Sequence, residues 1–377
     1  MAPTDTEADA PPSLVDWSTA ERVAGWALAR QALPAGYAPE ALQREFDELT
    51  AQAEELVAAE TGLRPPTGPA RARVIDRQGW VGANVASIQR LLGPTLAKVE
   101  HRPPPPALAA LPAWLPRSMS GASRQVGGAQ LGLVLGWMAS RVLGQYDILL
   151  TDEAVDDQDL VYYVGPNVVA LESRYGFDTR QFRLWLAIHE VTHRCQFTAV
   201  PWLRDHFVAL VDQGLEPLAT DPSRMGDALK RAVDELRAGH SPIGESGMLG
   251  LVATPEQLEA LQRIQALMSL LEGHGDVTMD RAGAAAVPGA ARFSQVLRER
   301  RQQVRGPAKL LQRVLGLEAK MRQYAEGEDF VNAVEAAGGR DLLDRVWRGP
   351  EWLPSLAEIR DPGEWISRVR AQPAIAG

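Results

Sequence analysis

Three residues in the middle of the chain have the types and spacing of a metal site. His189, Glu190 and His193 form the pattern His-Glu-x-x-His. Two histidines four residues apart lie on one face of a helix, so both imidazoles can reach the same metal ion. Zn²⁺ lowers the pKa of a bound water to about 7, and a carboxylate beside the ligands can then accept the proton of that water. The pattern therefore predicts a zinc site with Glu190 as the general base.

The sequence around this pattern favours a helix. Asp178 and Gln181 have the spacing of a capping box, which is typical of a helix start. An apolar stripe follows at helical spacing, formed by Leu184, Ile188, Val191 and Cys195. A second face carries His189, His193 and Gln196. We therefore expect a helix that packs into the core on one side and presents a polar site on the other.

A catalytic zinc ion usually has three protein ligands and one open position, so the motif needs a third ligand. The metzincin class is excluded, because its third histidine would stand where this chain has Ala199. Glu272 and Asp276 are four residues apart and share a helix face. They resemble the pair in glutamate-type zincins, where a glutamate binds zinc and an aspartate four residues later orients a ligand histidine. The resemblance implies that Glu272 is the third ligand and that Asp276 orients His189.

His274 is the alternative third ligand. It lies about 200° around a regular helix from Glu272, so the two side chains cannot comfortably face the same ion. The glycines at positions 273 and 275 make a regular helix less certain. At the level of sequence the choice stays open, with Glu272 preferred.

Five longer segments are more specific than the five-residue pattern. They are Val74–Trp80 with Asn84, Gly144–Asp147, Arg183–Arg204, Leu271–Asp276 and Arg322–Phe330. Through them the chain resembles a family of zincin-like hydrolases, common in actinobacteria, over nearly its full length. The resemblance implies a zincin-like metallopeptidase fold with a helical N-terminal part, and it implies no particular substrate. Some members carry a label that links them to deazaflavin-coenzyme biosynthesis, but the shared residues show no flavin-like site.

The remaining sequence predicts a mainly α fold with a small β-sheet or hairpin. Helical periodicity runs through residues 14–92 as three helices, the third of them within Arg71–Leu92, and returns beyond the motif. Short strands are expected at Gln145–Leu150 and Leu160–Val164. The segment Asn167–Leu171 is expected to form a third strand or a turn of helix.

Four consecutive prolines at residues 103–106 predict an extended segment and a domain boundary. We expect a disordered tail at residues 1–13, a helical N-terminal domain at 14–118 and a zincin-like catalytic domain at 119–377. The acidic N-terminus lacks the apolar core of a signal peptide. The longest apolar run is far shorter than the roughly 20 residues that span a bilayer. These features predict a cytoplasmic protein with no membrane segment.

The charge of the chain argues against nucleic acid as its partner. The formal net charge is −9, which repels a polyanion. The segment Arg292–Arg322 is an exception, with nine basic and two acidic side chains. Apolar residues are interleaved there at helical spacing, which favours the solvated basic face of amphipathic helices over a binding surface for an acidic partner.

The sequence therefore predicts a zinc-dependent metallohydrolase, and more specifically a peptidase that acts on peptides or proteins. The alternative is a catalytically silent protein on a zincin scaffold, in which zinc serves structure or partner binding. Glu190 argues against that alternative, because a structural site needs no base beside its ligands. Tyr324 is a candidate for stabilising an oxyanion, although a structural tyrosine is the more common role.

Overall fold

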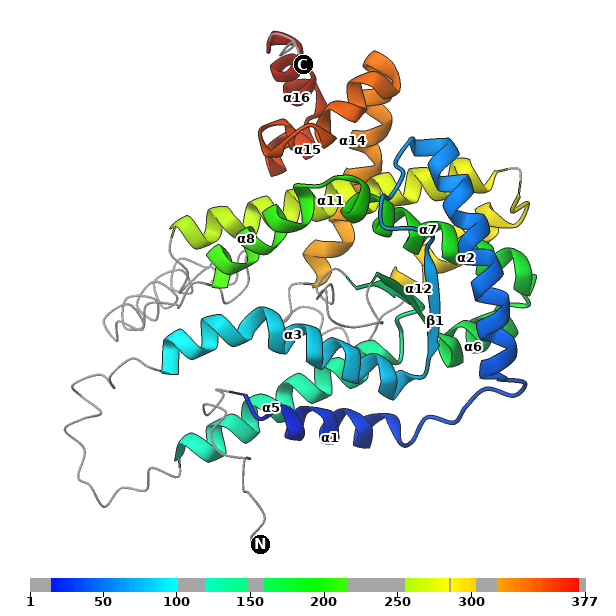
Figure 1. The fold of residues 1–377 in the computed structure, drawn as a ribbon, viewed down its shortest axis with the longest axis vertical. Coiled ribbons are helices and arrows are strands. Elements are labelled where there is room, and N and C mark those ends of the chain that lie inside the picture. Colours follow the sequence, from blue (N-terminus) through cyan, green and yellow to red (C-terminus); the bar gives the residue numbers. More distant parts are fainter. Residues whose placement is uncertain are drawn as a thin grey trace, which may run out of the picture. The chain divides into compact units, whose positions relative to one another are not determined.

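The computed structural model describes residues 15–100, 119–147, 159–215, 255–284, 286–302 and 317–372. Helices make up most of these residues, and three strands form one small sheet (Figure 1). The mainly α fold with a small sheet is therefore confirmed. The chain divides into two compact units, each assembled from several stretches of sequence. No helix among the described residues combines the length and the apolar character that crossing a membrane requires.

The first unit comprises residues 1–37, 75–143 and 164–169. Its helices are α1 (Trp17–Leu28), α3 (Arg77–Glu100) and α5 (Met119–Ala139). Helices α1 and α5 pack very closely, because a Cβ atom on Gly132 would lie 2.3 Å from the carbonyl oxygen of Ala20. Small residues at such a crossing let two helix backbones approach each other. The buried core of this unit is formed by Ala24, Leu28, Trp80, Val81, Val85, Leu135, Ala139 and Val164.

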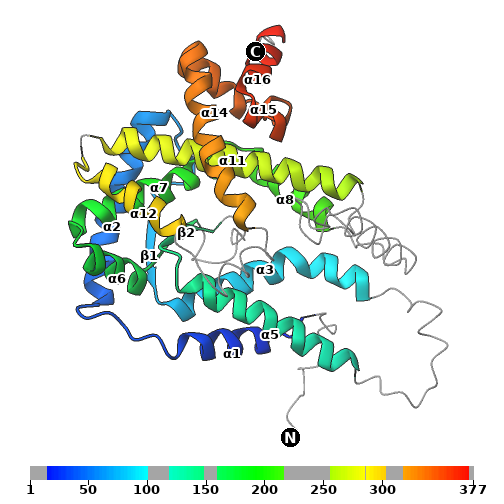
Figure 2. The same ribbon diagram turned by 180° about the vertical axis from the view of Figure 1, so that it is seen from behind.

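The second unit comprises residues 38–74, 144–163 and 170–377, and it contains the predicted site. Its central helices are α7 (Thr179–Ala199) and α11 (Pro255–Gly283), which pack against each other. Helix α2 (Pro39–Thr61) also packs on α7, and α8 (Leu203–Leu215) and α14 (Leu317–Leu343) pack on α11 (Figure 2). The unit is completed by α12 (Ala290–Gln302), the 3₁₀ turns Asp344–Trp347 and Pro350–Trp352, α15 (Leu356–Arg360) and α16 (Pro362–Ala371).

The sheet has the strand order β1-β3-β2. Strand β3 (Leu160–Val164) is buried along its whole length, as its continuous apolar sequence predicts for a central strand. Strand β2 (Gly144–Tyr146) runs antiparallel to it, with Gly144 opposite Tyr163. The strand predicted at Leu160–Val164 is therefore confirmed, and the one predicted at Gln145–Leu150 is shorter, with residues 148–150 outside the described part.

Two segments near the sheet complete the comparison with the sequence. The helix predicted within Arg71–Leu92 is present as α3, which begins at Arg77, but residues 71–75 before it form strand β1 (Arg71–Ile75), which the sequence did not predict. The side chain of Gln43 explains the strand locally, because its amide accepts from the N–H of Val74 at 2.7 Å and donates to the carbonyl of Ala72 at 3.0 Å. The segment Asn167–Leu171, for which the sequence allows a third strand or a turn of helix, lies inside helix α6 (Gly165–Tyr175), so the helical alternative is confirmed.

The predicted domain division stays a prediction. Its boundary at residue 118 and the predicted tail at residues 1–13 both lie outside the described residues. The two compact units follow spatial packing instead of chain order, since the first unit takes in both α1 and α5.

Candidate metal centre

Helix α7 has the start that the sequence predicts. Asp178 is its N-cap, and the carboxylate Oδ1 accepts a hydrogen bond of 2.9 Å from the N–H of Gln181. Thirteen of the helix's residues are buried, including every member of the predicted apolar stripe. Packing on that side fixes the rotation of the helix, so the two motif histidines are held on the opposite, partly exposed side.

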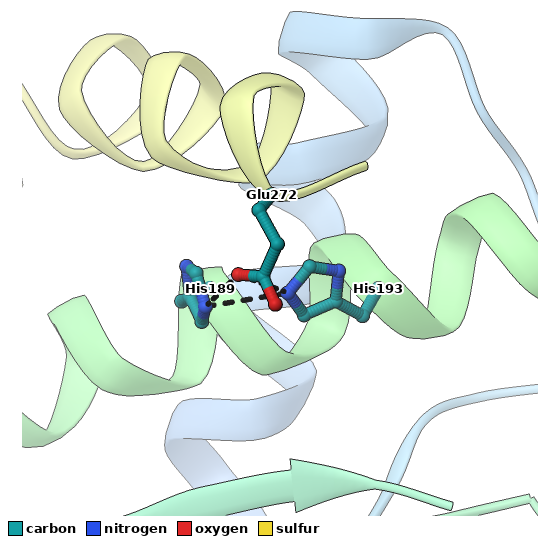
Figure 3. Close-up of side chains that lie close together, drawn as sticks. All are labelled: His189, His193 and Glu272. Atoms are coloured by element: carbon teal, nitrogen blue, oxygen red, sulfur yellow. Dashed lines mark hydrogen bonds and ion pairs between the residues drawn. The ribbon is translucent and has the colours of Figure 1, made fainter. Parts of the chain in front are cut away.

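His189, His193 and Glu272 bring three possible metal-binding atoms together (Figure 3). The Nε2 atoms of the two histidines are 3.3 Å apart. Glu272 Oε2 lies 3.7 Å from Nε2 of His189 and 3.6 Å from Nε2 of His193. The three side chains are 15–18% exposed, so none of them is completely buried. In the described part of the chain, these are the histidine and carboxylate groups whose geometry could hold a metal ion.

These separations fit a zinc ion. Ligand atoms around a tetrahedral Zn²⁺ with bonds of about 2.0–2.1 Å are about 3.4 Å apart. The three observed separations lie within a few tenths of an ångström of that value. Two histidines and one glutamate are also a known ligand set of catalytic zinc. The donor atoms and their spacing therefore suit zinc with only small adjustments.

Glycines place Glu272 next to the histidines. A Cβ atom on Gly273 would lie 2.1 Å from the carbonyl carbon of Gly327, so helices α11 and α14 touch backbone to backbone at this turn. A Cβ atom on Gly275 would lie 3.4 Å from Cε1 of His193. Helix α11 is continuous through both glycines, so the regular helix that separates Glu272 from His274 is observed.

Asp276 lies beside His189, as the resemblance to glutamate-type zincins implies. Its Oδ1 atom is 3.7 Å from Nδ1 of His189. This distance is longer than a direct hydrogen bond, and it places a carboxylate on the side of the ring that faces away from Glu272. The arrangement allows Asp276 to influence His189 electrostatically.

His274 points away from the three converging atoms. It is buried, its Nδ1 lies 3.0 Å from Nε2 of Gln196, and its ring stacks edge-on against Trp347. Burial lowers the pKa of His274 to about 3, so this histidine is neutral at physiological pH. The structure thus places His274 behind His193, with Gln196 between them.

Gln196 is a polar neighbour of the site whose contact with His193 the sequence did not predict. Its Oε1 atom lies 3.0 Å from Nδ1 of His193, and its side chain is fully buried. The available signal was its position on the same face as His189 and His193, one turn beyond the second histidine. A glutamine at that position carries no chemistry of its own, so its type did not single it out.

Glu190 lies under the edge strand of the sheet. It is 6% exposed, and a Cβ atom on Gly144 would lie 2.7 Å from its carboxylate. Burial raises the pKa of Glu190 to about 7, against a lowering effect of His193 and of the N–H of Tyr146, which donates to the carboxylate. A carboxylate with a pKa near 7 can both accept and release a proton at neutral pH.

Glu272 also changes the titration of His193. Burial alone would lower the pKa of His193, but hydrogen bonding and attraction to the Glu272 carboxylate raise it to about 9. Without a metal, the pair therefore holds a proton between the two helices. A cation that replaces this proton meets the same favourable negative charge.

The other residues singled out in the sequence are Tyr324, Cys195 and the basic segment. Tyr324 belongs to helix α14, but its side chain lies outside the described residues. Cys195 is fully buried on the apolar side of α7, as predicted. In the basic segment Arg292–Arg322, residues 303–316 lie outside the described part, the start belongs to α12 and the end to α14.

The chain matches the zincin-like metallopeptidase family over residues 15–366. It is also similar to a solved structure from Chloroflexus aurantiacus, a protein assigned provisionally as a hydrolase with a novel fold. The two share 32% sequence identity and a TM-score of 0.67, over 95% of this chain and 99% of the other. The curated proteins include no match. The family is therefore established: this chain belongs to the zincin-like metallopeptidases.

Proposed function

We propose that this protein is a zinc-dependent hydrolase whose substrates are peptides or proteins. The observation that carries the proposal is the convergence of three ligand-type atoms, on two helices, at the separations that zinc requires. The motif that supplies two of these atoms also supplies Glu190 one residue away. Membership of the zincin-like metallopeptidases supports a metal-dependent hydrolase, and the peptide substrate is the further step that we propose.

Each residue has a distinct role in this proposal. His189 and His193 bind the metal through Nε2, and Glu272 binds it through its carboxylate. When bound, Zn²⁺ supplies a lowered pKa for water and polarises the carbonyl group under attack. Glu190 accepts the proton of the attacking water at its carboxylate and can pass it to the leaving amine.

The burial of Glu190 supports an enzyme over a silent scaffold. A purely structural site gains nothing from a buried carboxylate, which costs free energy unless it is compensated. Here the carboxylate has a backbone N–H donor from strand β2, and Gly144 leaves space for it. A residue held at such cost beside the ligands is most simply understood as the base.

The test compares the purified wild-type protein with the Glu190→Gln variant on a peptide library. Both proteins should hold one zinc ion per chain, since Glu190 is not a proposed ligand. General acid–base catalysis contributes about 10²–10⁴-fold, so the variant should lose activity by that factor. Two results would contradict the proposal of a peptidase, provided that both proteins bind zinc. In the first, neither protein cleaves any peptide in the library, and in the second, both cleave peptides equally well.

A further inference from the structure

The amide of Gln196 contacts three polar groups inside the second unit. Its Oε1 atom lies 3.0 Å from Nδ1 of His193. Its Nε2 atom lies 3.0 Å from the carbonyl oxygen of Leu271 and 3.0 Å from Nδ1 of His274. The amide and the three groups that it contacts belong to helices α7 and α11, and Gln196 is fully buried.

One of these contacts fixes the orientation of the whole amide. A backbone carbonyl oxygen can only accept a hydrogen bond, so the NH₂ group of Gln196 must face Leu271. The second N–H of the same group then points at His274, whose Nδ1 must be the acceptor.

The orientation of the amide determines the tautomer of His193. With its nitrogen committed to Leu271 and His274, Gln196 presents only its oxygen to Nδ1 of His193. An amide oxygen accepts, so Nδ1 of His193 carries a proton and donates it. A neutral ring with its proton on Nδ1 leaves the lone pair of Nε2 free, and Nε2 is the atom that faces His189 and Glu272.

We propose that Gln196 is a positioning residue that fixes the tautomer and the ring orientation of His193 for zinc, and that the Leu271 carbonyl and His274 hold Gln196 in place. This inference rests on the proposed function, because it assumes that His193 binds zinc. Hydrogen-bond partners behind metal-binding histidines do this in other zinc sites, where their loss weakens binding.

The surroundings of Nδ1 differ between His189 and His193, and the difference explains why an amide lies beside His193. The group nearest Nδ1 of His189 is the carboxylate of Asp276, 3.7 Å away, and this side chain is 22% exposed. The partner of His193 is fully buried, and a buried carboxylate would need further compensation. The neutral amide of Gln196 accepts from Nδ1–H of His193 and donates to the Leu271 carbonyl and to His274, and it adds no buried charge.

The experiment measures zinc affinity by competition with a chromophoric chelator, using the full-length chain. Gln196→Met keeps the volume and removes the hydrogen bonds, and we expect a loss of affinity of roughly 10- to 100-fold. Thr192→Val is the matched control, because Thr192 has a buried hydroxyl on the same helix that donates to the Ile188 carbonyl and, among the described residues, has no contact with the proposed ligands. The control should bind zinc within about twofold of the wild type. The inference is wrong if Gln196→Met binds zinc as tightly as the control.

A second readout separates positioning from a general loss of structure. In the Co²⁺-loaded wild type, the Nδ1–H of His193 should give a shifted proton signal that exchanges slowly with water, because Gln196 covers it. In folded Gln196→Met the same signal should broaden or vanish, and a signal as well protected as in the wild type would overturn the inference. If the wild type itself binds no zinc, the proposed function fails first, which the chelator titration shows before any variant is compared.

Discussion

Gly273 and Gly327 bring two helices of the second unit into direct backbone contact. A Cβ atom on Gly327 would lie 1.9 Å from the carbonyl oxygen of Ser269, and one on Gly273 would lie 2.1 Å from the carbonyl carbon of Gly327. Gly273 directly follows Glu272, so the crossing of α11 and α14 holds the turn that carries the proposed third ligand. Both glycines belong to segments through which the chain resembles its family.

Replacing Gly327 with alanine should therefore weaken both the fold and the metal site. The new methyl group has no room, and overpacking of this kind costs about 1–3 kcal/mol or more. We expect a lower melting temperature and weaker zinc binding together, measured by thermal unfolding and chelator competition. Gly214→Ala is the control, since a Cβ atom there meets nothing closer than 3.8 Å. Wild-type stability and zinc affinity in Gly327→Ala would contradict the role given to the crossing.

Gly144→Ala should impair catalysis and leave zinc binding intact. The added methyl group would lie 2.7 Å from Cγ and Oε1 of Glu190, so the base must move. Because a small displacement of a catalytic group costs about 10²-fold in rate, we expect a loss of that order in kcat. The comparison is made with Gly82→Ala, where nothing lies within 4 Å of the added atom. Unchanged kcat in Gly144→Ala would show that Glu190 needs no such space.

Arg194→Met should strongly destabilise the second unit. The guanidinium is fully buried and bonds to Asp159 through Nε and Nη2, at 2.9 and 2.6 Å, and to Glu54 at 2.6 Å. Removing it leaves two carboxylates without their cation, and breaking a buried ion pair costs about 3–5 kcal/mol. Arg194→Lys should recover only part of the loss, because an ammonium group cannot reproduce the planar fork. Denaturant unfolding of both variants measures this, and a wild-type midpoint for Arg194→Met would contradict it.

The thiol of Cys195 should be unreactive in the native protein at pH 8. Burial raises its pKa to about 12, so almost no thiolate is present, and thiolate is the reactive form. Since the unfolded thiol loses its proton first, the free energy of unfolding should fall as the pH rises from about 9 toward 12. Iodoacetamide labelling with and without denaturant tests the reactivity, because the chain has one cysteine. Rapid, stoichiometric labelling of the native chain would contradict this prediction.

Much of the site could be predicted from the sequence, because its elements are local. Positions 189, 190 and 193 share one helix, and their spacing fixes their relative places. Likewise the spacing of Glu272 and Asp276 follows from helix geometry alone. The packing of α7 on α11 depends on residues far apart in the sequence. No local pattern predicts which turn of α11 faces α7.

The features that escaped prediction depend on such long-range contacts. Gln196 gains its role only from Leu271 and His274 on another helix. Strand β1 forms because β3 and the side chain of Gln43 satisfy its backbone, which overrides the helical tendency of the residues that follow. The Gly273–Gly327 contact also joins segments more than fifty residues apart, so the two glycines could not be paired from sequence.

The proposed function depends above all on a zinc ion bound by His189, His193 and Glu272. Anomalous diffraction at the zinc absorption edge, from crystals of the zinc-loaded protein, tests it most directly. One strong peak is expected at about 2.0–2.2 Å from Nε2 of both histidines and from the carboxylate of Glu272. A zinc-loaded crystal with no peak there, or with the ion bound by other residues, would contradict it.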